Sequence, residues 1–279
     1  MRGKAGFLVR LYFTHKGYSP KMHILVTNDD GITAPGLLAL AKEMASLGKV
    51  TVLAPDRNWS ASGHAKTMDR PMRVKEVSIL DGIPAFSTDG APSDCVALAV
   101  LGVLHEKIDL VVSGINPNAN LGHDVTYSGT VTAAMEAVIW GLPGFAVSVN
   151  APSHAAGGVD FIPAARVARR IVQTVIQQAI PPNIIFNINV PYLAEKEIKG
   201  YMITRQGLRV YLDKLVSRED PRGRPYYWIG GEEPTGVPDE GTDFGALSQD
   251  YVSITPLHLD MTAYSVIKTL SAWTWDEQG

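Results

Sequence analysis

The chain has 279 residues, of which 46% are hydrophobic, and its 25 Lys and Arg against 28 Asp and Glu give a net charge of -3. This length and composition predict a soluble globular protein with one large domain, or one domain plus an appendage. The slightly negative charge offers no broad basic surface, which excludes a nucleic-acid polymer or an anionic membrane as the main partner. No apolar segment reaches the roughly 18 to 20 residues that span a bilayer.

The first segment, 1–21, stands apart from the rest of the sequence. Its short apolar stretch, Phe7–Phe13, is interrupted by Arg10, and no cleavage site of small residues follows, so we expect no signal peptide. Because Met22 directly precedes the first convincing strand, 1–21 is predicted to be a disordered extension or to lie upstream of the native start. The single cysteine, Cys95, cannot form an internal disulfide, which agrees with a cytoplasmic location.

From Met22 to about residue 150, short β-branched apolar segments alternate with stretches of helical periodicity. This alternation is typical of an α/β fold with a mostly parallel sheet that is covered on both faces. The expected strands are His23–Thr27, Val50–Ala54, Pro84–Ser87, Asp109–Ser113 and Phe145–Val149. The expected helices are Gly36–Leu47, which Gly48 closes, Pro92–His105, and Thr130–Trp140, which Gly141 and Pro143 stop.

The pattern changes after Asn150. An amphipathic helix at about 160–178 and a strand at Ile184–Val190 are followed by strand pieces near Met202, Tyr226 and Val252. The basic stretch 205–224 and the acidic, Gly- and Pro-rich stretch 232–243 predict a protruding solvated hairpin and loop; an oligomer contact or a substrate lid is the alternative. We therefore expect one domain over 22–279, with a regular half at about 22–150 and a remainder at about 151–279.

Polar residues follow several of the predicted strands at their carboxyl ends, where open parallel sheets bind ligands. Asp29 and Asp30 come directly after the first strand. A divalent cation with oxygen ligands would relieve the repulsion between these two carboxylates. The same residues also suit a turn in which Gly31 takes positive φ, so both interpretations stay open. Ser60 and Asn116, from two other loops, could complete the oxygen ligands of a magnesium-type ion, although single loop residues of this kind more often bond their own backbone.

The sequence from Tyr127 to Val131 lies where a loop enters a helix. Free amides and the positive dipole end make such a position a phosphate site, so Ser128, Gly129 and Thr130 are phosphate-binding candidates, with an ordinary helix cap as the alternative. His64 and His123 lie in loops and could act as an acid or a phosphate ligand, although a single loop histidine usually does neither. No Gly-x-Gly pair, P-loop, His-Glu-x-x-His or Gly-x-Ser-x-Gly motif occurs, which argues against dehydrogenases, ATPases, zinc peptidases and serine hydrolases.

Taken together, these motifs resemble the SurE family of survival-protein phosphatases. The resembling segments are Ile24–Gly31, Ala54–Asp56, Ser60–His64, Thr88–Val96, Val112–Asn116, Asn120, Gly122, Tyr127–Val131, Asn187–Pro191 and Tyr251–Pro256. They occur in the same order as in the family and cover the chain from about Met22 to its end. One departure lies at Asn116–Asn120, where the family often has an arginine and this chain has none, which affects substrate preference more than activity.

The resemblance implies a Rossmann-like three-layer α/β/α sandwich with a C-terminal β-hairpin or arm used in oligomerisation. It implies one divalent ion per subunit, most often magnesium or manganese, held by the residues Asp29, Asp30, Ser60 and Asn116. The implied activity is hydrolysis of nucleoside 5'- or 3'-monophosphates to nucleoside and phosphate, and some members also shorten polyphosphate. The resemblance also implies a homodimer or homotetramer with exchanged C-terminal segments, which the family commonly forms.

The expected mechanism is direct attack of a water, activated by the cation, on phosphorus, with Asp29 or Asp30 positioning or deprotonating that water. Asn116, Asn120 and the amides of Ser128–Thr130 are expected to hold the non-bridging oxygens. The alternative is a non-catalytic metal- or nucleotide-binding module of the receiver type. Asp109 opens its strand instead of following it, and Asn150 rather than a lysine follows the strand at Phe145, which counts against that module.

Overall fold

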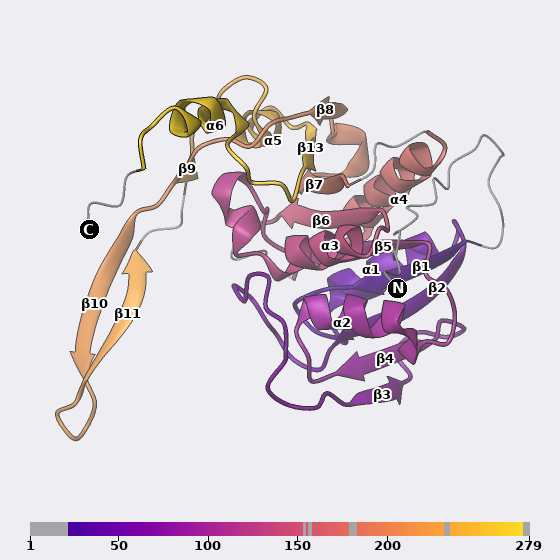
Figure 1. Ribbon diagram of the computed structural model, residues 1–279. Helices are drawn as coiled ribbons and strands as arrows, with labels where there is room; N and C mark the ends of the chain where they lie inside the picture. The colour runs from indigo at the N-terminus through magenta and orange to yellow at the C-terminus, as the bar shows by residue number, and fades with distance from the viewer. Residues whose placement is uncertain (1–21, 153–154, 156–157, 179–182, 232–234, 276–279) are drawn as a thin grey trace, which may run out of the picture.

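The computed structural model describes residues 22–152, 155, 158–178, 183–231 and 235–275, so the predicted extension 1–21 lies outside the described residues. A nine-stranded sheet forms the centre of the molecule (Figure 1). Its strands are β1 (His23–Thr27), β2 (Lys49–Pro55), β3 (Val74–Val77), β4 (Ala85–Thr88), β5 (Leu110–Asn116), β6 (Gly144–Asn150), β7 (Ile185–Pro191), β8 (Tyr201–Ile203) and β13 (Val252–Leu257). Their order is β3-β4-β2-β1-β5-β6-β7-β13-β8, and all neighbours are parallel except β3 with β4 and β7 with β13.

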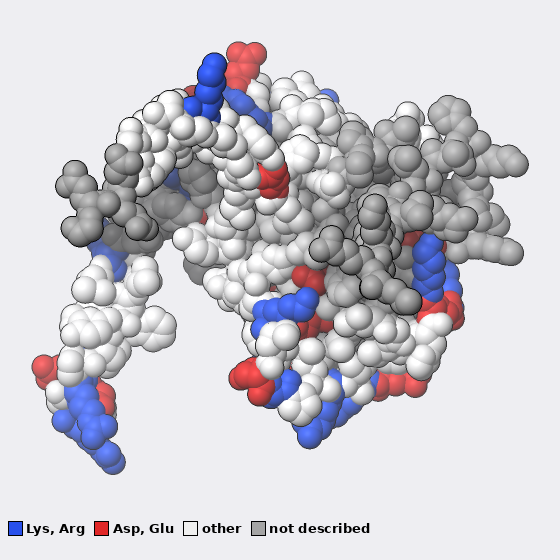
Figure 2. Space-filling model, in the orientation of Figure 1, with Lys and Arg blue, Asp and Glu red and all other residues white. Residues whose placement is uncertain are grey.

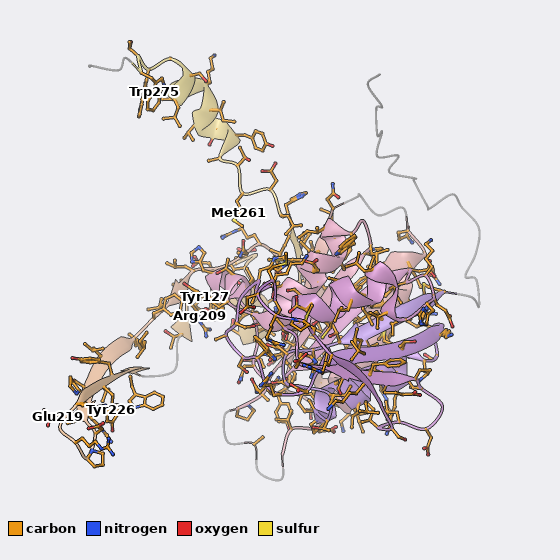
Figure 3. The ribbon with its side chains drawn as sticks, turned by 60° about the horizontal axis from the view of Figure 1, so that its bottom comes forward. Tyr127, Arg209, Glu219, Tyr226, Met261 and Trp275 are labelled. Atoms are coloured by element: carbon orange, nitrogen blue, oxygen red, sulfur yellow. The ribbon has the colours of Figure 1, made fainter. Side chains whose placement is uncertain are left out.

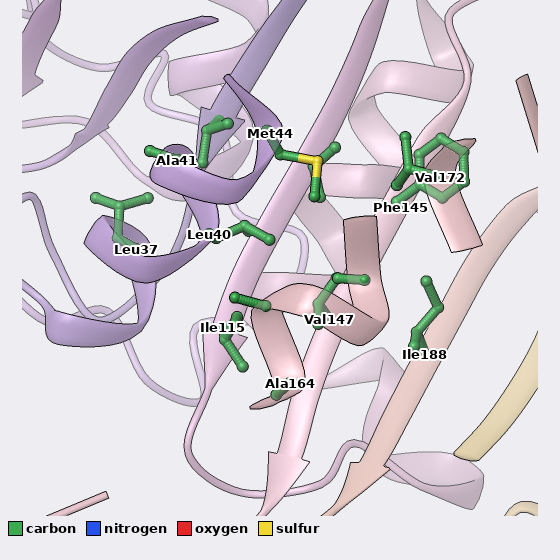
Figure 4. Close-up of a cluster of buried hydrophobic side chains, with 14 of the residues drawn as sticks. Leu37, Leu40, Ala41, Met44, Ile115, Phe145, Val147, Ala164, Val172 and Ile188 are labelled. Atoms are coloured by element: carbon green, nitrogen blue, oxygen red, sulfur yellow. The ribbon is translucent and has the colours of Figure 1, made fainter. Parts of the chain in front are cut away.

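Helices cover both faces of this sheet. On one face, α1 (Pro35–Met44) and α4 (Ile162–Ile176) pack over β1, β5, β6 and β7 in the largest hydrophobic cluster. Figure 4 shows part of this cluster, in which Leu40 and Met44 of α1 and Val172 of α4 lie over Phe145 and Ile188 of the sheet. On the other face, α2 (Pro92–Leu98) and α3 (Gly129–Ile139) cover β1, β2 and β5. These three layers confirm the predicted α/β fold class.

The order of the strands fixes where a ligand can bind. β1 pairs in parallel with β2 on one side and with β5 on the other, so the chain winds outward from β1 and β5 in opposite directions. In such sheets the crevice outside the carboxyl ends of the two central strands is the usual ligand site. Asp29 and Asp30 follow β1 and Asn116 ends β5, so three predicted site residues flank this crevice.

The irregular second half contains the predicted hairpin. β10 (Asp213–Glu219) and β11 (Pro225–Gly231) pair antiparallel and project from the body, and β9 (Arg209–Val210) with β12 (Thr235–Gly236) forms the root (Figure 1). Basic side chains gather at the tip of the hairpin (Figure 2). After β13 the chain continues into α6 (Tyr264–Ser271), which also stands away from the body (Figure 3). No helix among the described residues has the length and apolar character that crossing a membrane requires.

The helix predicted from Pro92 to about His105 changes its type along its length. The helix expected over Pro92–His105 ends as an α-helix at Leu98 and continues as a π-helical segment, η1 (Ala99–Val103), in which Gly102 has φ 113°. Glycine adopts this conformation without the steric cost that a side chain incurs. The edge strand β3 and the helices α5 (Asp243–Ser248) and α6 were not predicted, whereas β8, β11 and β13 match the expected strand pieces.

A substitution at Phe145, in the centre of the sheet, tests the packing of the hydrophobic core. Its side chain is fully buried and stacks on Phe186 with 5.1 Å between ring centroids. We expect Phe145→Ala to lower the free energy of unfolding by about 3 to 5 kcal/mol, because the lost ring leaves a cavity between α4 and the sheet. Urea denaturation measures this loss. Leu101→Ala, at a side chain that is 69% exposed, is the control and should change stability by less than about 0.5 kcal/mol. Equal effects of the two substitutions would contradict the assigned packing.

Candidate metal and phosphate site

Asp29 is the most enclosed of the four predicted cation ligands. Only 4% of it is exposed, and its Oδ1 accepts a hydrogen bond from Thr130 Oγ1 at the start of α3. Gly129 lies directly against the Asp29 side chain, since a Cβ at Gly129 would stand 2.6 Å from Asp29 Cβ and 3.0 Å from Oδ2. The absence of a side chain at Gly129 therefore allows the N-terminus of α3 to touch the Asp29 carboxylate.

The two adjacent carboxylates carry negative charge that the described protein does not neutralise. Burial raises the pKa of Asp29, and the Thr130 hydrogen bond opposes this only in part. Burial, followed by the nearby charge of Asp29, raises the pKa of Asp30 to about 6. Among the described residues, no Lys, Arg or His forms an ion pair with either carboxylate. Enclosed, uncompensated carboxylate oxygens fit a hard divalent cation.

The turn after β1 is held by a different residue. Asn28 Nδ2 donates to the Gly31 carbonyl at 3.0 Å, and the Gly31 amide donates to Asn28 Oδ1 at 3.2 Å. Gly31 has φ 102°, which supports the turn interpretation for this glycine. The side chain that closes the turn is therefore that of Asn28 and not that of Asp30. The Asp30 carboxylate makes no hydrogen bond within the described part of the chain. A turn and a cation site are thus compatible at this position.

Ser60 and Asn116 reach the same edge from two directions. The Trp59 amide donates to the Asp29 carbonyl at 2.8 Å, which places the loop that carries Ser60 beside Asp29. Ser60 is exposed, and its amide donates to Asn58 Oδ1 at 2.6 Å. Asn116 is half-buried, and its Nδ2 donates to the Asn118 carbonyl at 2.5 Å, with no bond to Oδ1 among the described residues. The hydroxyl of Ser60 and Oδ1 of Asn116 are suitable oxygens, and their binding to a cation stays a prediction.

The N-terminal residues of α3 make more hydrogen bonds within the chain than the sequence predicted. Ser128 Oγ accepts from the Val131 amide at 3.1 Å, so Ser128 is an ordinary helix cap as well as a phosphate candidate. The hydroxyl and the amide of Thr130 both bond Asp29. Among the described residues, the Gly129 amide is left without a partner, and this N–H is the one best suited to a phosphate oxygen.

Asn120 lies in a buried polar network on the far side of Asn116. Its Nδ2 donates to Ser148 Oγ at 2.8 Å, its amide donates to Asn189 Oδ1 at 2.8 Å, and its carbonyl accepts from Asn187 Nδ2 at 2.8 Å. These bonds fix the loop between β5 and the turn before α3. Asn120 Nδ2 has two N–H groups, so the second one can make the predicted phosphate contact while the bond to Ser148 is kept.

The sequence did not identify Asp124, which supports the helix start from the other side. Asp124 lies in the turn η2 (Gly122–Thr126), and its Oδ1 accepts from Tyr211 OH at 2.6 Å while its Oδ2 lies 2.8 Å from Arg209 Nε. This hydrogen bond is the first cause that raises the pKa of Tyr211 to about 12. Figure 3 shows Arg209 beside Tyr127 at the root of the hairpin. Only the tertiary fold brings these residues together, because 85 or more positions separate Asp124 from its partners and no spacing rule relates them.

Comparison with known proteins identifies relatives over nearly the whole chain. The family model described as Survival protein SurE matches residues 24–213. The protein 5'-nucleotidase SurE of Herpetosiphon aurantiacus is 52% identical over 255 residues, which are 91% of this chain and 99% of that protein. The 5'-nucleotidase SurE of Chloroflexus aggregans is 49% identical over 91% of this chain and 100% of its own. The crystal structure of Sure protein from Aquifex aeolicus superposes with a TM-score of 0.77 at 43% identity, over 89% of this chain and 98% of that chain.

Gly129→Ala tests the close approach of α3 to Asp29. We expect a loss of about 1 to 3 kcal/mol in the free energy of unfolding, because the added methyl group must push Asp29 and the helix apart. Thermal or urea denaturation measures it. Gly230→Ala is the matched control, since its methyl group would meet the Val216 side chain at 3.3 Å and the Lys214 carbonyl oxygen only at 3.8 Å. A Gly129→Ala variant as stable as the control variant would contradict the described contact.

Proposed function

The chain belongs to the SurE family, and we propose that it is a phosphoric monoester hydrolase that converts nucleoside 5'-monophosphates to nucleoside and phosphate with one divalent cation per subunit. The observation that carries this proposal is the pair of buried Asp29 and half-buried Asp30, which has no cationic partner among the described residues. Asp29 of this pair contacts the N-terminus of α3. Nucleoside 3'-monophosphates and polyphosphate are further proposed substrates. A metal- or nucleotide-binding module without activity is the outcome that the assay below would reveal.

The proposed cation ligands are the carboxylates of Asp29 and Asp30, the hydroxyl of Ser60 and Oδ1 of Asn116. This set consists of hard oxygens only, which suits magnesium or manganese. A bound ion of this type supplies positive charge for the phosphoryl oxygens and lowers the pKa of a water molecule. Support for the proposal comes from the position of these residues at the carboxyl ends of β1, β2 and β5, on both sides of the point where the strand order reverses.

Asp29 and Asp30 have different roles in the proposed reaction. Asp29 is held in one orientation by Thr130 and by contact with Gly129, so it is suited to fix geometry. Asp30 is more exposed and has no hydrogen-bond partner in the described chain, so its carboxylate is the proposed acceptor of the proton of the attacking water. The Gly129 amide is the proposed hydrogen-bond donor to a phosphate oxygen, and the positive end of the α3 dipole favours the negative charge of the phosphate.

The predicted cytoplasmic location and homo-oligomer are part of the same proposal. Cys95, the single cysteine, is buried and unpaired, which suits a reducing compartment. The hairpin β10–β11 exposes large apolar side chains: Leu215 and Trp228 are largely exposed and Ile229 is 84% exposed. The C-terminal segment around α6 exposes Trp275 in the same way. Because such surfaces favour burial against another chain, we propose a homodimer or homotetramer with exchanged C-terminal segments.

Asp29→Asn is the sharpest test of the activity. We expect phosphate release from nucleoside 5'-monophosphates in the presence of magnesium or manganese to fall at least about hundredfold, because the variant loses a charged cation ligand. The panel includes nucleoside 3'-monophosphates, p-nitrophenyl phosphate and polyphosphate, each with either metal or with EDTA. Release that persists in EDTA, or equal release by the variant, would contradict the proposed site, and no release from any substrate would favour the binding module.

The stability of the same variant provides the control for folding. Asparagine keeps an oxygen for the Thr130 hydroxyl but removes the buried charge that burial disfavours. In EDTA we therefore expect Asp29→Asn to unfold at the same temperature as the wild type or at a higher one. Loss of activity without loss of stability separates a role in the reaction from a structural role.

The hairpin can be tested separately from the site. We expect the double substitution Trp228→Ser and Ile229→Ser to reduce the molecular mass measured by light scattering, since both side chains are exposed in the single chain and would be buried in an assembly. Leu101→Ser, at another exposed apolar position on the body, should leave the mass unchanged. A monomeric wild type would contradict the proposed oligomer.

A further inference from the structure

A buried carboxylate on α3 lies outside the predicted metal and phosphate site. Glu136 is only 2% exposed, and its Oε1 accepts hydrogen bonds from Trp140 Nε1 at 2.8 Å and from Lys66 Nζ at 3.1 Å. His64 Nε2 lies 3.0 Å from its Oε2. Burial alone would raise the pKa of Glu136, but the three donors outweigh this effect and lower it to about 2. Glu136 is therefore ionised and fully bonded at neutral pH.

Two of these three donors come from the loop that carries Ser60. His64 and Lys66 lie 72 and 70 residues away from Glu136 in the sequence, so these bonds join a loop to a distant helix. Thr132, one turn before Glu136 on α3, donates from Oγ1 to the Gly63 carbonyl at 3.0 Å. Gly129, Thr132 and Glu136 recur at spacings of three and four residues, so they lie on one side of the helix. The same side of α3 thus touches Asp29 at its first turn and the Ser60 loop further along.

The loop has few other attachments near Ser60. Among the described residues, its other bonds to the body near Ser60 are the Trp59 amide to the Asp29 carbonyl before Ser60 and the Gly63 amide to the Tyr127 carbonyl at 2.9 Å after it. Further along, the Thr67 amide donates to the Asp94 carboxylate. Ser60 and Ala61 are exposed, and Ala61 has φ 57°, a conformation that is unfavourable for a residue with a side chain. The position of Ser60 consequently depends on polar bonds on both sides and on the half-buried Trp59 beside it.

We propose that Glu136 is a positioning residue, which holds His64 and Lys66 so that the loop presents the Ser60 hydroxyl to the cation held by Asp29 and Asp30. This inference rests on the proposed cation site and deepens it. Glu136 touches neither substrate nor cation and acts through the loop alone. It also gives His64 a structural role, because His64 Nε2 is bonded to Glu136.

The test uses Glu136→Gln in the full-length protein. The amide keeps an oxygen for Trp140 but removes the charge that holds Lys66 and His64, so we expect the Mn²⁺ dissociation constant, measured by electron paramagnetic resonance, to rise about tenfold. Hydrogen exchange of residues 57–66 should become faster while that of β5 and β6 stays the same. Lys66→Met, which removes one exposed donor, should give a smaller change of the same kind. Combined with Glu136→Gln, it should add almost nothing, because both substitutions break the same bond.

Glu195→Gln is the matched control, since Glu195 is a surface carboxylate that binds Arg170. It should change neither Mn²⁺ binding nor exchange of the loop. The proposal is overturned if Glu136→Gln binds Mn²⁺ like the wild type, or if the loop exchanges faster without any change in Mn²⁺ affinity. It is also overturned if the wild type binds no Mn²⁺. If the wild type binds Mn²⁺ but releases no phosphate, the proposed hydrolase fails while the altered binding in Glu136→Gln still supports the positioning role.

Discussion

The negative charge of Asp29 and Asp30 at the end of β1 is the constraint on which the rest of the site depends. A buried carboxylate without a cationic partner destabilises a fold, and the described chain offers Asp29 only neutral donors, from Thr130 and from its own backbone. α3 can approach this charge because Gly129 has no side chain, and the favourable end of its dipole then faces the carboxylate. The fold therefore keeps a charge that it does not neutralise itself at the place where parallel sheets bind ligands.

α3 connects this charge to the Ser60 loop. Its first turn contacts Asp29, and two turns later Glu136 holds His64 and Lys66, so one rigid helix determines both positions. The two buried carboxylates differ in their surroundings. Glu136 has three hydrogen-bond donors, two of them from side chains that can carry positive charge, and its pKa falls, whereas the pKa of Asp29 rises because its donors are few and neutral. A satisfied carboxylate stabilises structure, and an unsatisfied one marks a place for a ligand.

The sequence was sufficient for the regular half and for the residues at the strand ends. Strand β1 has the predicted bounds, and Asp29 and Asn116 flank the same crevice because the carboxyl ends of parallel strands share one edge. What the sequence did not reveal was tertiary. Glu136 has no local pattern that distinguishes it from a solvated helix residue, and its partners are about 70 residues away. Asp124 was missed for the same reason, because its partners Tyr211 and Arg209 come from the distant hairpin root. Helix α6 was missed because its exposed apolar residues do not contribute to the core of a single chain.

The hairpin and α6 in the second half of the chain differ from the regular half in the burial of their apolar side chains. In the regular half, apolar side chains are buried between sheet and helices, whereas the hairpin and α6 leave Trp228, Ile229 and Trp275 largely exposed. Exposed apolar side chains of this size are stabilised when another surface covers them. The root of the hairpin is not independent of the site, because Arg209 and Tyr211 bind Asp124 four residues before Ser128. An assembly that fixed the hairpin would therefore also restrict the turn that leads into α3, and the same turn determines how the helix N-terminus meets Asp29.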